Sequence, residues 1–288
     1  MRWLALYLAI PVLAATYDVT PPAVRQGETM RLHGTGPVTA ARLNGRTVKL
    51  FHQPSGEWLG LMPVGAEDLP GVYEIQFLAE DGSVEHTAGV TLQSANFPKQ
   101  NITISNEIAS IKPSPGEMET VGEFRKTVTD ERYWTDAPFA LPLPGCYTSP
   151  FGVRRYYNGK PTGDYHGGID QRAMKGYPVR AVESGVVRIV QKFALHGGTV
   201  AVDHGQGVES IYLHLGDFGT TEGARVKRGD VIGYAGSTGR STAPHLHWSL
   251  YVNGVPVNPL QWVSLKACAA PRPASGKRKP HQAQPGKS

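Results

Sequence analysis

The feature that most limits the fold of this sequence is the frequent interruption of short apolar runs by turn residues. The chain of 288 residues has 34 glycines and 23 prolines, which follow no fixed period and separate many of these runs. Apolar runs of about four to eight residues between turn signals are typical of strands, whereas a helical bundle needs longer periodic segments. The sequence therefore predicts a mainly β protein built from antiparallel sheets.

Two parts of the chain carry this strand pattern. Residues 16–95 alternate apolar and polar positions around Asn44-Gly45 and Asp81-Gly82, which are hairpin signals, and predict a small immunoglobulin-like β-sandwich. Residues 141–266 contain longer β-branched runs, such as "GTVAVDHGQGVESIYLHL", separated by glycine-containing turns. These runs predict a second domain with an antiparallel β-sheet and little helix.

The segment between the two domains, residues 96–140, has a weaker strand pattern and more prolines. We interpret it as a linker with one short helix within residues 116–129, because the prolines around that stretch stop a longer one. The aromatic residues Tyr133, Trp134 and Phe139 are expected to pack the linker against a domain.

The start of the chain resembles an export signal. Residues 1–15 combine one positive charge, at Arg2, with an apolar run from Trp3 to Leu13 and two alanines suited to cleavage. The run is too short to be a stable membrane span, although a retained amphipathic anchor is the alternative. No cysteine follows the run, which disfavours a lipoprotein. We therefore expect an exported protein.

The end of the chain, residues 267–288, accounts for the basic character of the sequence. The formal net charge is +5, and this tail holds five basic residues and no acidic one. Such a composition predicts a disordered, solvated tail, with weak attachment to an anionic wall polymer or membrane as the alternative. Without the tail the charge is near neutral, so we expect no nucleic-acid partner.

Export also affects the interpretation of Cys146 and Cys268, the only two cysteines of the chain. In an oxidising compartment, two cysteines at opposite ends of one domain favour a disulfide bridge. Two unpaired buried thiols are the alternative.

Three short segments of the second domain bring together residues that bind metals. His166 and Asp170 flank two glycines in "DYHGGIDQ", and His245 and His247 leave one face of the strand expected for "PHLHW". His214 lies in a further run, "IYLHL". Each residue alone has an ordinary structural explanation, as we assume for His196 and His204. Together, imidazoles and a carboxylate suit zinc and leave a position open for water.

These segments resemble the lysostaphin/LytM-type zinc metalloendopeptidases. The resemblance covers residues 142–262 and rests on "SPFGVRRYYNG", "HGGID", "PVRAVESGVV", "IYLHL", "VKRGDVIGYAGSTGRSTAPHLHW" and "VNGVPVNP", in that order. It implies a small antiparallel β scaffold with an open groove, and peptides of bacterial peptidoglycan as substrate.

The resemblance also implies a role for each site residue. His166, Asp170 and His247 correspond to the zinc ligands, with one zinc ion per catalytic domain, and His214 and His245 to the catalytic histidines. The chain has no H-E-x-x-H motif, so a histidine has to act as the base; which of the two does so stays open. Three departures from the family pattern, at Gln171, Thr199 and Ala243, remove none of these residues.

The sequence thus predicts an exported zinc metalloendopeptidase that hydrolyses peptide bonds in peptidoglycan cross-links or stem peptides. The expected location is the periplasm or cell envelope, or outside the cell, and the expected state is a monomer. The alternative function is a non-catalytic peptidoglycan-binding activator of a cell-wall amidase.

Overall fold

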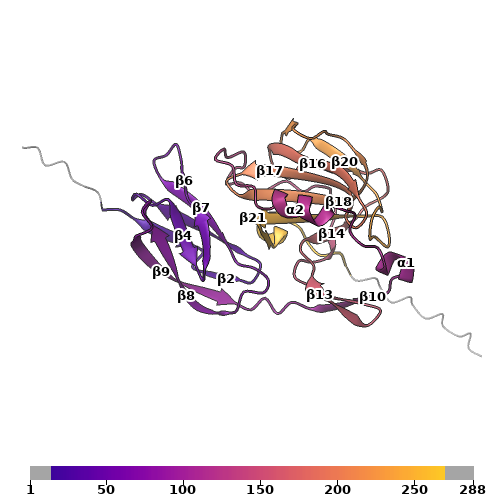
Figure 1. Ribbon diagram of the computed structural model, residues 1–288, viewed down its shortest axis with the longest axis horizontal. Helices are drawn as coiled ribbons and strands as arrows, with labels where there is room; N and C mark the ends of the chain where they lie inside the picture. The colour runs from indigo at the N-terminus through magenta and orange to yellow at the C-terminus, as the bar shows by residue number, and fades with distance from the viewer. Residues whose placement is uncertain (1–13, 270–288) are drawn as a thin grey trace, which may run out of the picture.

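The computed structural model describes residues 14–269, which form two β-rich lobes lying side by side (Figure 1). The predicted signal peptide up to residue 13, and the predicted tail from residue 270 onward, lie outside the described residues. Among residues 14–269, no helix is long and apolar enough to cross a membrane. Strands dominate both lobes, which confirms the predicted mainly β class.

The N-terminal lobe is a sandwich of two sheets with strand orders β1-β3-β7-β6 and β2-β9-β8-β4-β5. Its strands are β1 (Tyr17–Thr20), β2 (Ala23–Arg25), β3 (Thr29–Gly34), β4 (Ala40–Leu43), β5 (Arg46–Lys49), β6 (Phe51–His52), β7 (Trp58–Pro63), β8 (Gly71–Leu78) and β9 (Val84–Gln93). Side chains from both sheets, including Met30, Leu32, Ile75 and Phe77, form one buried core. This arrangement confirms the predicted β-sandwich.

The C-terminal lobe is built on a ten-stranded sheet whose main path is β11-β14-β21-β18-β17-β16-β19. Its elements are β11 (Tyr147–Ser149), β14 (Ile169–Arg172), β15 (Pro178–Arg180), β16 (Gly185–Phe193), β17 (Gly197–Gly205), β18 (Val208–Phe218), β19 (Arg225–Val226), β20 (Val231–Ala235), β21 (His245–Val252), β22 (Val255–Val257) and the 3-10 turn η1 (Pro259–Gln261). All strand pairs of this ten-stranded sheet are antiparallel, as predicted.

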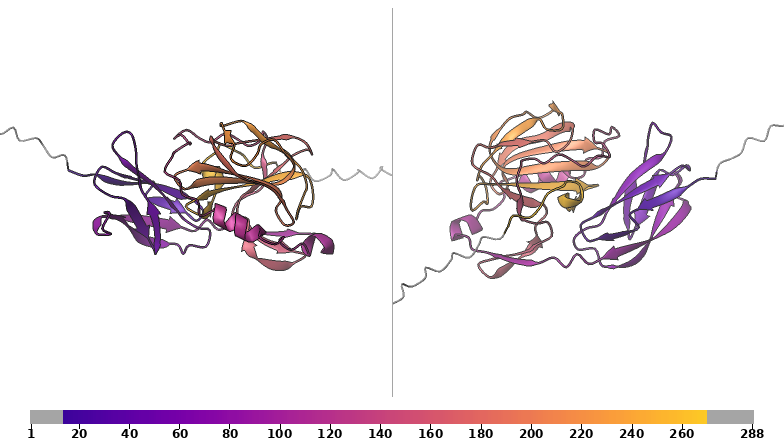
Figure 2. Two further views of the ribbon diagram at one scale, coloured as in Figure 1. Left: turned by 45° about the horizontal axis from the view of Figure 1, so that its top comes forward. Right: turned by 180° about the vertical axis from the view of Figure 1, so that it is seen from behind.

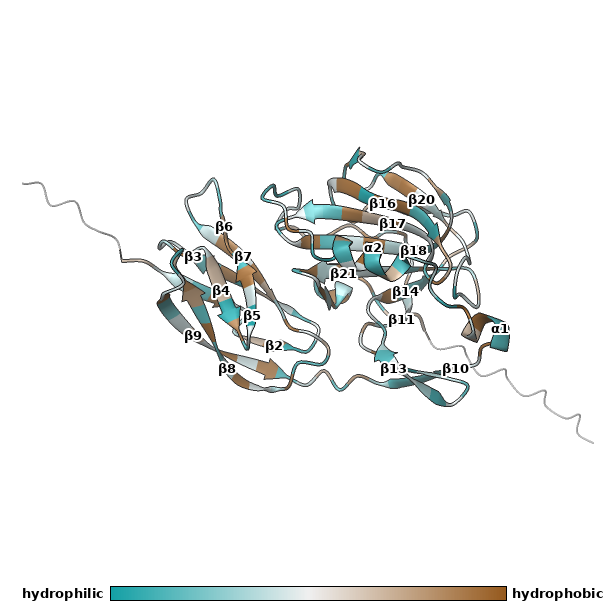
Figure 3. Ribbon diagram, viewed as in Figure 1, coloured by the Kyte–Doolittle hydropathy of each residue, from teal (hydrophilic) through white to brown (hydrophobic). Residues whose placement is uncertain are grey.

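The alternation of residues along β21 decides which face of this sheet is the core. Leu246, Trp248 and Leu250 are fully buried in the main core of the lobe. The residues between them leave the opposite face, because successive side chains of a strand point to opposite sides. Apolar stretches in other strands of the sheet, such as β16 and β20, supply the same core (Figure 3).

Residues 96–140, expected to be a linker, pack closely on the second lobe. They form β10 (Lys99–Ile102), α1 (Asn106–Ala109) and α2 (Glu117–Phe124), the last lying within the stretch for which a helix was predicted. Strand β10 pairs in parallel with β12 (Arg154–Tyr157), which forms a hairpin with β13 (Lys160–Tyr165). Helix α2 packs on one face of the large sheet (Figures 1 and 2).

Two of the three aromatic residues behave as expected, since Trp134 and Phe139 are buried in the main core of the C-terminal lobe. Tyr133 is only half-buried and lies outside this core. The same core takes Leu59 and Leu61 from β7 of the sandwich. The Nδ2 amide of Asn253 donates to the Leu61 carbonyl at 2.8 Å. The two lobes therefore share one continuous apolar interface.

The predicted disulfide between Cys146 and Cys268 is present, across a sequence separation of 122 residues. Next to it, the Tyr147 amide donates to the Lys266 carbonyl at 3.1 Å, and the Cys268 amide donates to the Tyr147 carbonyl at 2.9 Å. Because Tyr147 begins β11, the bridge and these hydrogen bonds fix residues 266–268 to the edge of the sheet.

Candidate metal centre

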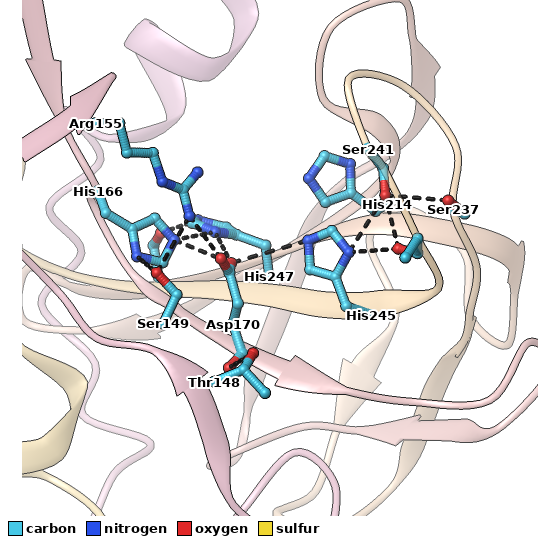
Figure 4. Close-up of polar contacts among 12 residues, drawn as sticks. Thr148, Ser149, Arg155, His166, Asp170, His214, Ser237, Ser241, His245 and His247 are labelled. Atoms are coloured by element: carbon cyan, nitrogen blue, oxygen red, sulfur yellow. Dashed lines mark hydrogen bonds and ion pairs between the residues drawn. The ribbon is translucent and has the colours of Figure 1, made fainter. Parts of the chain in front are cut away.

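The pairing of β14 with β21 assembles the centre. In this register Asp170 lies directly opposite His247, and both side chains leave the sheet on the face away from the core. His166 precedes β14 by three residues, and the chain returns to the same point through Gly167 and Gly168. Side chains from two strands that are far apart in the sequence thus converge (Figure 4).

The three candidate ligand atoms lie within hydrogen-bond distance of one another. His166 Nε2 is 3.0 Å from Asp170 Oδ1 and 2.9 Å from His247 Nδ1, and His247 Nδ1 is 2.8 Å from Asp170 Oδ1. All three residues are largely shielded from solvent. The structure therefore brings together the three residues that the resemblance assigned to the metal.

The protonation of these residues shows whether a cation fits. His166 Nδ1 lies 2.8 Å from the Pro150 carbonyl, which only accepts, so the proton is on Nδ1 and the lone pair of Nε2 faces the centre. Burial lowers the pKa of His247 to about 4, which keeps its imidazole neutral near pH 7. Burial works to raise the pKa of Asp170, yet His166 and His247 hold it well below its usual value.

Three electron-pair donors therefore point at one another. A proton on His247 Nδ1 would be donated to His166 Nε2 or Asp170 Oδ1 and would leave the contact between those two atoms without a proton. A cation between the three atoms would instead accept an electron pair from each of them. Two imidazoles and a carboxylate are a typical donor set for zinc. The residues present thus fit a zinc ion.

One residue of the centre was missed by the sequence analysis. Arg155 Nη2 lies 2.5 Å from Asp170 Oδ2, and its side chain is only 21% exposed. This ion pair occupies the carboxylate oxygen that faces away from the two histidines and leaves Oδ1 for the metal. A weak indication is visible in the sequence, because Arg154 and Arg155 are adjacent in a strand-like run and their side chains have to point to opposite faces.

The two candidate catalytic histidines lie beside the three ligands. The rings of His214 and His245 have their centroids 4.8 Å apart, and His245 Nε2 is 3.9 Å from Asp170 Oδ1. His214 comes from β18 and adopts a left-handed backbone conformation, with φ of 62°. Such a conformation is unfavourable for a residue with a side chain and is often found at functional sites.

Each of these histidines has one ring nitrogen fixed by a backbone carbonyl. His214 Nδ1 donates to Thr238 at 2.8 Å, and His245 Nδ1 donates to Ala243 at 2.7 Å. The protons are therefore on Nδ1, and each Nε2 is left as a base. Burial, followed by the nearby rings of His245 and His247, lowers the pKa of His214 to about 3, so its imidazole is neutral.

Two other residues singled out in the sequence, His204 and Gln171, lie away from the centre. His204 is buried between the Ser184 carbonyl and the Ser210 hydroxyl, each at 2.8 Å, and has the structural role assumed for it. Gln171 lies on the core face of β14, where its Oε1 accepts from Trp248 Nε1 at 3.1 Å. The change at Gln171 therefore concerns packing beneath the site.

A groove of about 860 Å³ runs along the metal-facing side of the sheet. His166, His214 and His247 lie in its wall, and α1 and α2 border it as well. The fixed charges of its lining are four cations and one carboxylate, namely Arg125, Arg155, Lys160, Arg240 and Asp164. The groove is therefore suited to an extended ligand that carries negative charge.

Comparison with known proteins agrees with this geometry. The model of peptidase family M23 matches residues 164–259, a range that contains all five candidate site residues. Residues 164–259 form a peptidase family M23 domain. This assignment confirms the resemblance to the lysostaphin/LytM-type enzymes. Arg155 and α2 lie outside the matched range, in the part of the chain that precedes it.

Individual relatives of the M23 domain carry peptidoglycan-related names. The DD-carboxypeptidase/endopeptidase Mpg of Neisseria meningitidis is 46% identical over 116 residues, which are 39% of this chain and 26% of that protein. The peptidoglycan DD-endopeptidase ShyA of Vibrio cholerae is 34% identical over 131 residues, which are 46% of this chain and 29% of that protein. The chain thus spans less than a third of the length of these relatives.

A solved structure extends the likeness beyond the M23 domain. A Pseudomonas aeruginosa protein assigned to peptidase M23 superposes with a TM-score of 0.63 and 23% identity. The match covers 85% of this chain and 95% of that one, a share that includes both lobes. This likeness concerns the fold.

Proposed function

We propose that the protein is a zinc metallo-endopeptidase that hydrolyses peptide bonds of peptidoglycan in the cell envelope. The observation that carries the proposal is the convergence of His166, Asp170 and His247, with the rings of His214 and His245 beside them. The M23 domain and the peptidoglycan endopeptidases among its relatives support the same activity. The predicted export segment fits a substrate outside the cytoplasm.

The metal would contribute Lewis acidity: held by His166, Asp170 and His247, a zinc ion would polarise the scissile carbonyl and acidify a water molecule. The protein's own histidines transfer the protons. His214 and His245 both keep Nε2 free of the hydrogen bond that holds Nδ1, and one of them takes a proton from the attacking water. The resulting imidazolium then donates to the developing oxyanion or to the leaving amine.

The backbone carbonyls of Thr238 and Ala243 determine which ring nitrogen of His214 and His245 can exchange protons. Each holds the Nδ1 proton of one histidine, so only Nε2 exchanges protons with the substrate. Because both carbonyls are part of the main chain, the orientation of the rings is largely set before substrate binds. Preorganised groups of this kind need little rearrangement in the transition state.

The charge of the groove supports a proposal for the class of peptidoglycan peptide that it binds. Arg155 is paired with Asp170, which leaves three cations and one carboxylate in the lining of the groove. This balance favours peptides with free carboxylates, such as cross-linked stem peptides that contain D-alanine and diaminopimelate. A neutral glycine bridge gains nothing from these cations. The complete set of five site residues argues against the alternative of a non-catalytic amidase activator.

The test separates the two histidines of β21. We expect His247→Ala to lose zinc and activity, whereas His245→Ala keeps about one zinc per chain and loses turnover. Metal analysis gives the first result, and mass spectrometry of fragments released from defined peptidoglycan gives the second. Equal loss of zinc in both variants would show that the two roles are wrongly assigned. A wild-type protein that contains zinc and releases no fragments would refute the proposed activity.

A further inference from the structure

The first turn of α2 contains a fully buried carboxylate, Glu117, which is 0% exposed. Its Oε2 accepts from the Ser114 amide at 2.7 Å and the Ser114 hydroxyl at 2.8 Å. Its Oε1 accepts from the His196 amide at 2.8 Å and His196 Nδ1 at 2.6 Å, and the Leu195 amide lies 3.1 Å from it. Both oxygens are therefore saturated by donors. Most of these donors come from the loop of residues 194–198, by which we mean the turn between β16 and β17 together with the first two residues of β17.

These donors make Glu117 a strong anchor for that loop. Burial alone would raise the pKa of Glu117, but the hydrogen bonds from His196 and Ser114 lower it to about 2. The carboxylate is therefore charged at all pH values at which the protein is expected to work. Hydrogen bonds to an ionised acceptor are about twice as strong as neutral ones.

The same loop contacts His214 on its other side. The His214 amide donates to the His196 carbonyl at 3.1 Å. Two residues further, the Gly198 amide donates to Thr238 Oγ1 at 2.8 Å, and the Thr238 carbonyl accepts the Nδ1 proton of His214. The loop thus supports both the backbone and the ring of His214, whose left-handed conformation has to be held by its surroundings.

The packing of α2 keeps Glu117 in place. Val121 and Phe124 are buried in a cluster with Ile211 and Leu213 of β18, the strand that carries His214. Helix α2 is therefore attached to this strand twice, through its apolar face and through the loop.

We propose that Glu117 is a positioning residue for His214, acting through the loop of residues 194–198, so that α2 is part of the active site. This inference rests on the proposed function of His214 in proton transfer. It assigns a catalytic requirement to a segment that precedes the M23 domain and touches none of the three candidate metal ligands.

The test compares two carboxylates of α2 in the full-length protein. In Glu117→Gln, an amide NH₂ group faces backbone N–H donors, and we expect kcat to fall about 10- to 100-fold, the usual effect of losing a supporting contact. The KM and the zinc affinity should stay within about threefold, because the ligands are not touched. The matched control is Glu119→Gln, which alters an exposed glutamate of the same helix and should leave kcat unchanged.

A second control separates positioning from general destabilisation. Val226→Ala removes packing from the main core at β19, at the far end of the sheet from β11, and leaves α2 and the carboxylate unaltered; it should lower the melting temperature but retain kcat. If Val226→Ala loses as much kcat as Glu117→Gln, or if Glu117→Gln keeps wild-type kcat, the proposal is overturned. If Glu117→Gln does not fold, Ser114→Ala decides, since it removes one donor to the same carboxylate; an unchanged kcat then refutes the proposal.

A readout without substrate distinguishes this inference from the proposed function. In long-range ¹H–¹⁵N spectra of the zinc-loaded protein, His214 should be a single Nδ1–H tautomer in the wild type and a mixture in Glu117→Gln. His214→Asn provides the assignment. A wild type that cleaves no peptidoglycan but shows this change would refute the enzyme and keep the positioning role. Identical His214 spectra in both proteins would refute the positioning role.

Discussion

We expect Gly168→Ala to bind zinc much more weakly than Gly167→Ala, although the two glycines are neighbours between His166 and Asp170. A Cβ atom at residue 168 would lie 2.5 Å from Ser249 Oγ and 2.9 Å from His247 Nε2, and closer still to the Trp248 carbonyl oxygen. A Cβ atom at residue 167 would meet only Pro256 Cβ, at 3.9 Å. Only the first change therefore forces β21 away from β14.

The magnitude follows from these distances. Ordinary van der Waals contact begins near 3.4 Å, so the strand that carries His247 has to move by about 1 Å. Metal–ligand distances tolerate deviations of only about 0.2 Å. Overpacking of this kind costs about 1–3 kcal/mol, which corresponds to a roughly 5- to 150-fold lower zinc affinity if the metal-bound state bears the strain.

The assay is a competition titration of the metal-free proteins against a chromophoric zinc chelator. Gly167→Ala should match the wild type within about twofold and serves as the control for a change of backbone freedom. Circular dichroism checks that Gly168→Ala is folded. Equal zinc affinities of the two alanine variants would refute the reasoning, because they would show that β14 and β21 separate without disturbing His247.

Three further predictions concern stability. Cys146→Ser with Cys268→Ser should lower stability by about 5 kcal/mol in the chain-entropy model for a loop of this length, seen as a melting temperature roughly 10–20 °C lower; a shift under 3 °C would contradict it. Because the pKa of Glu117 is depressed to about 2, its contribution should be complete above about pH 4.5 and fade towards pH 2. Urea unfolding of wild type and Glu117→Gln at several pH values should therefore converge in acid, and a constant difference would exclude this linkage. Gln171→Ala should lose about 1–3 kcal/mol by leaving buried Trp248 Nε1 without its acceptor, which chemical denaturation measures against Arg172→Ala at the exposed neighbouring position.

Several features were predictable because their causes are local. Alternation along "HLHW" places His245 and His247 on one face whatever the partner strands are. The Asn44-Gly45 pair, with φ of 46° and 80°, forms the hairpin between β4 and β5 that its residue types favour. With two cysteines in the chain, only one intramolecular pairing exists, and it is the one observed.

The remaining features depend on contacts between distant residues. Glu117 meets His196 across 79 positions. Arg155 reaches Asp170 because the backbone just before β12 is hydrogen-bonded to His166. Neither contact leaves a periodic pattern, so the sequence predicts only a linker with a short helix for residues 96–140, part of which lines the groove.

The sequence by itself determined the strand-rich class and the disulfide pairing, since these follow from alternation, turn chemistry and a single pair of cysteines. The five candidate site residues come from a motif and the family resemblance that it carries, and their roles stay a prediction. The tertiary structure decided which nitrogen of His166, His214 and His245 bears the proton, because that depends on carbonyls from other loops. It also decided that Gly168, unlike Gly167, lies against β21. The type of each side chain can be read from the sequence. The position of the proton on each histidine and the steric fit of Gly168 depend on contacts between segments that are distant in the sequence.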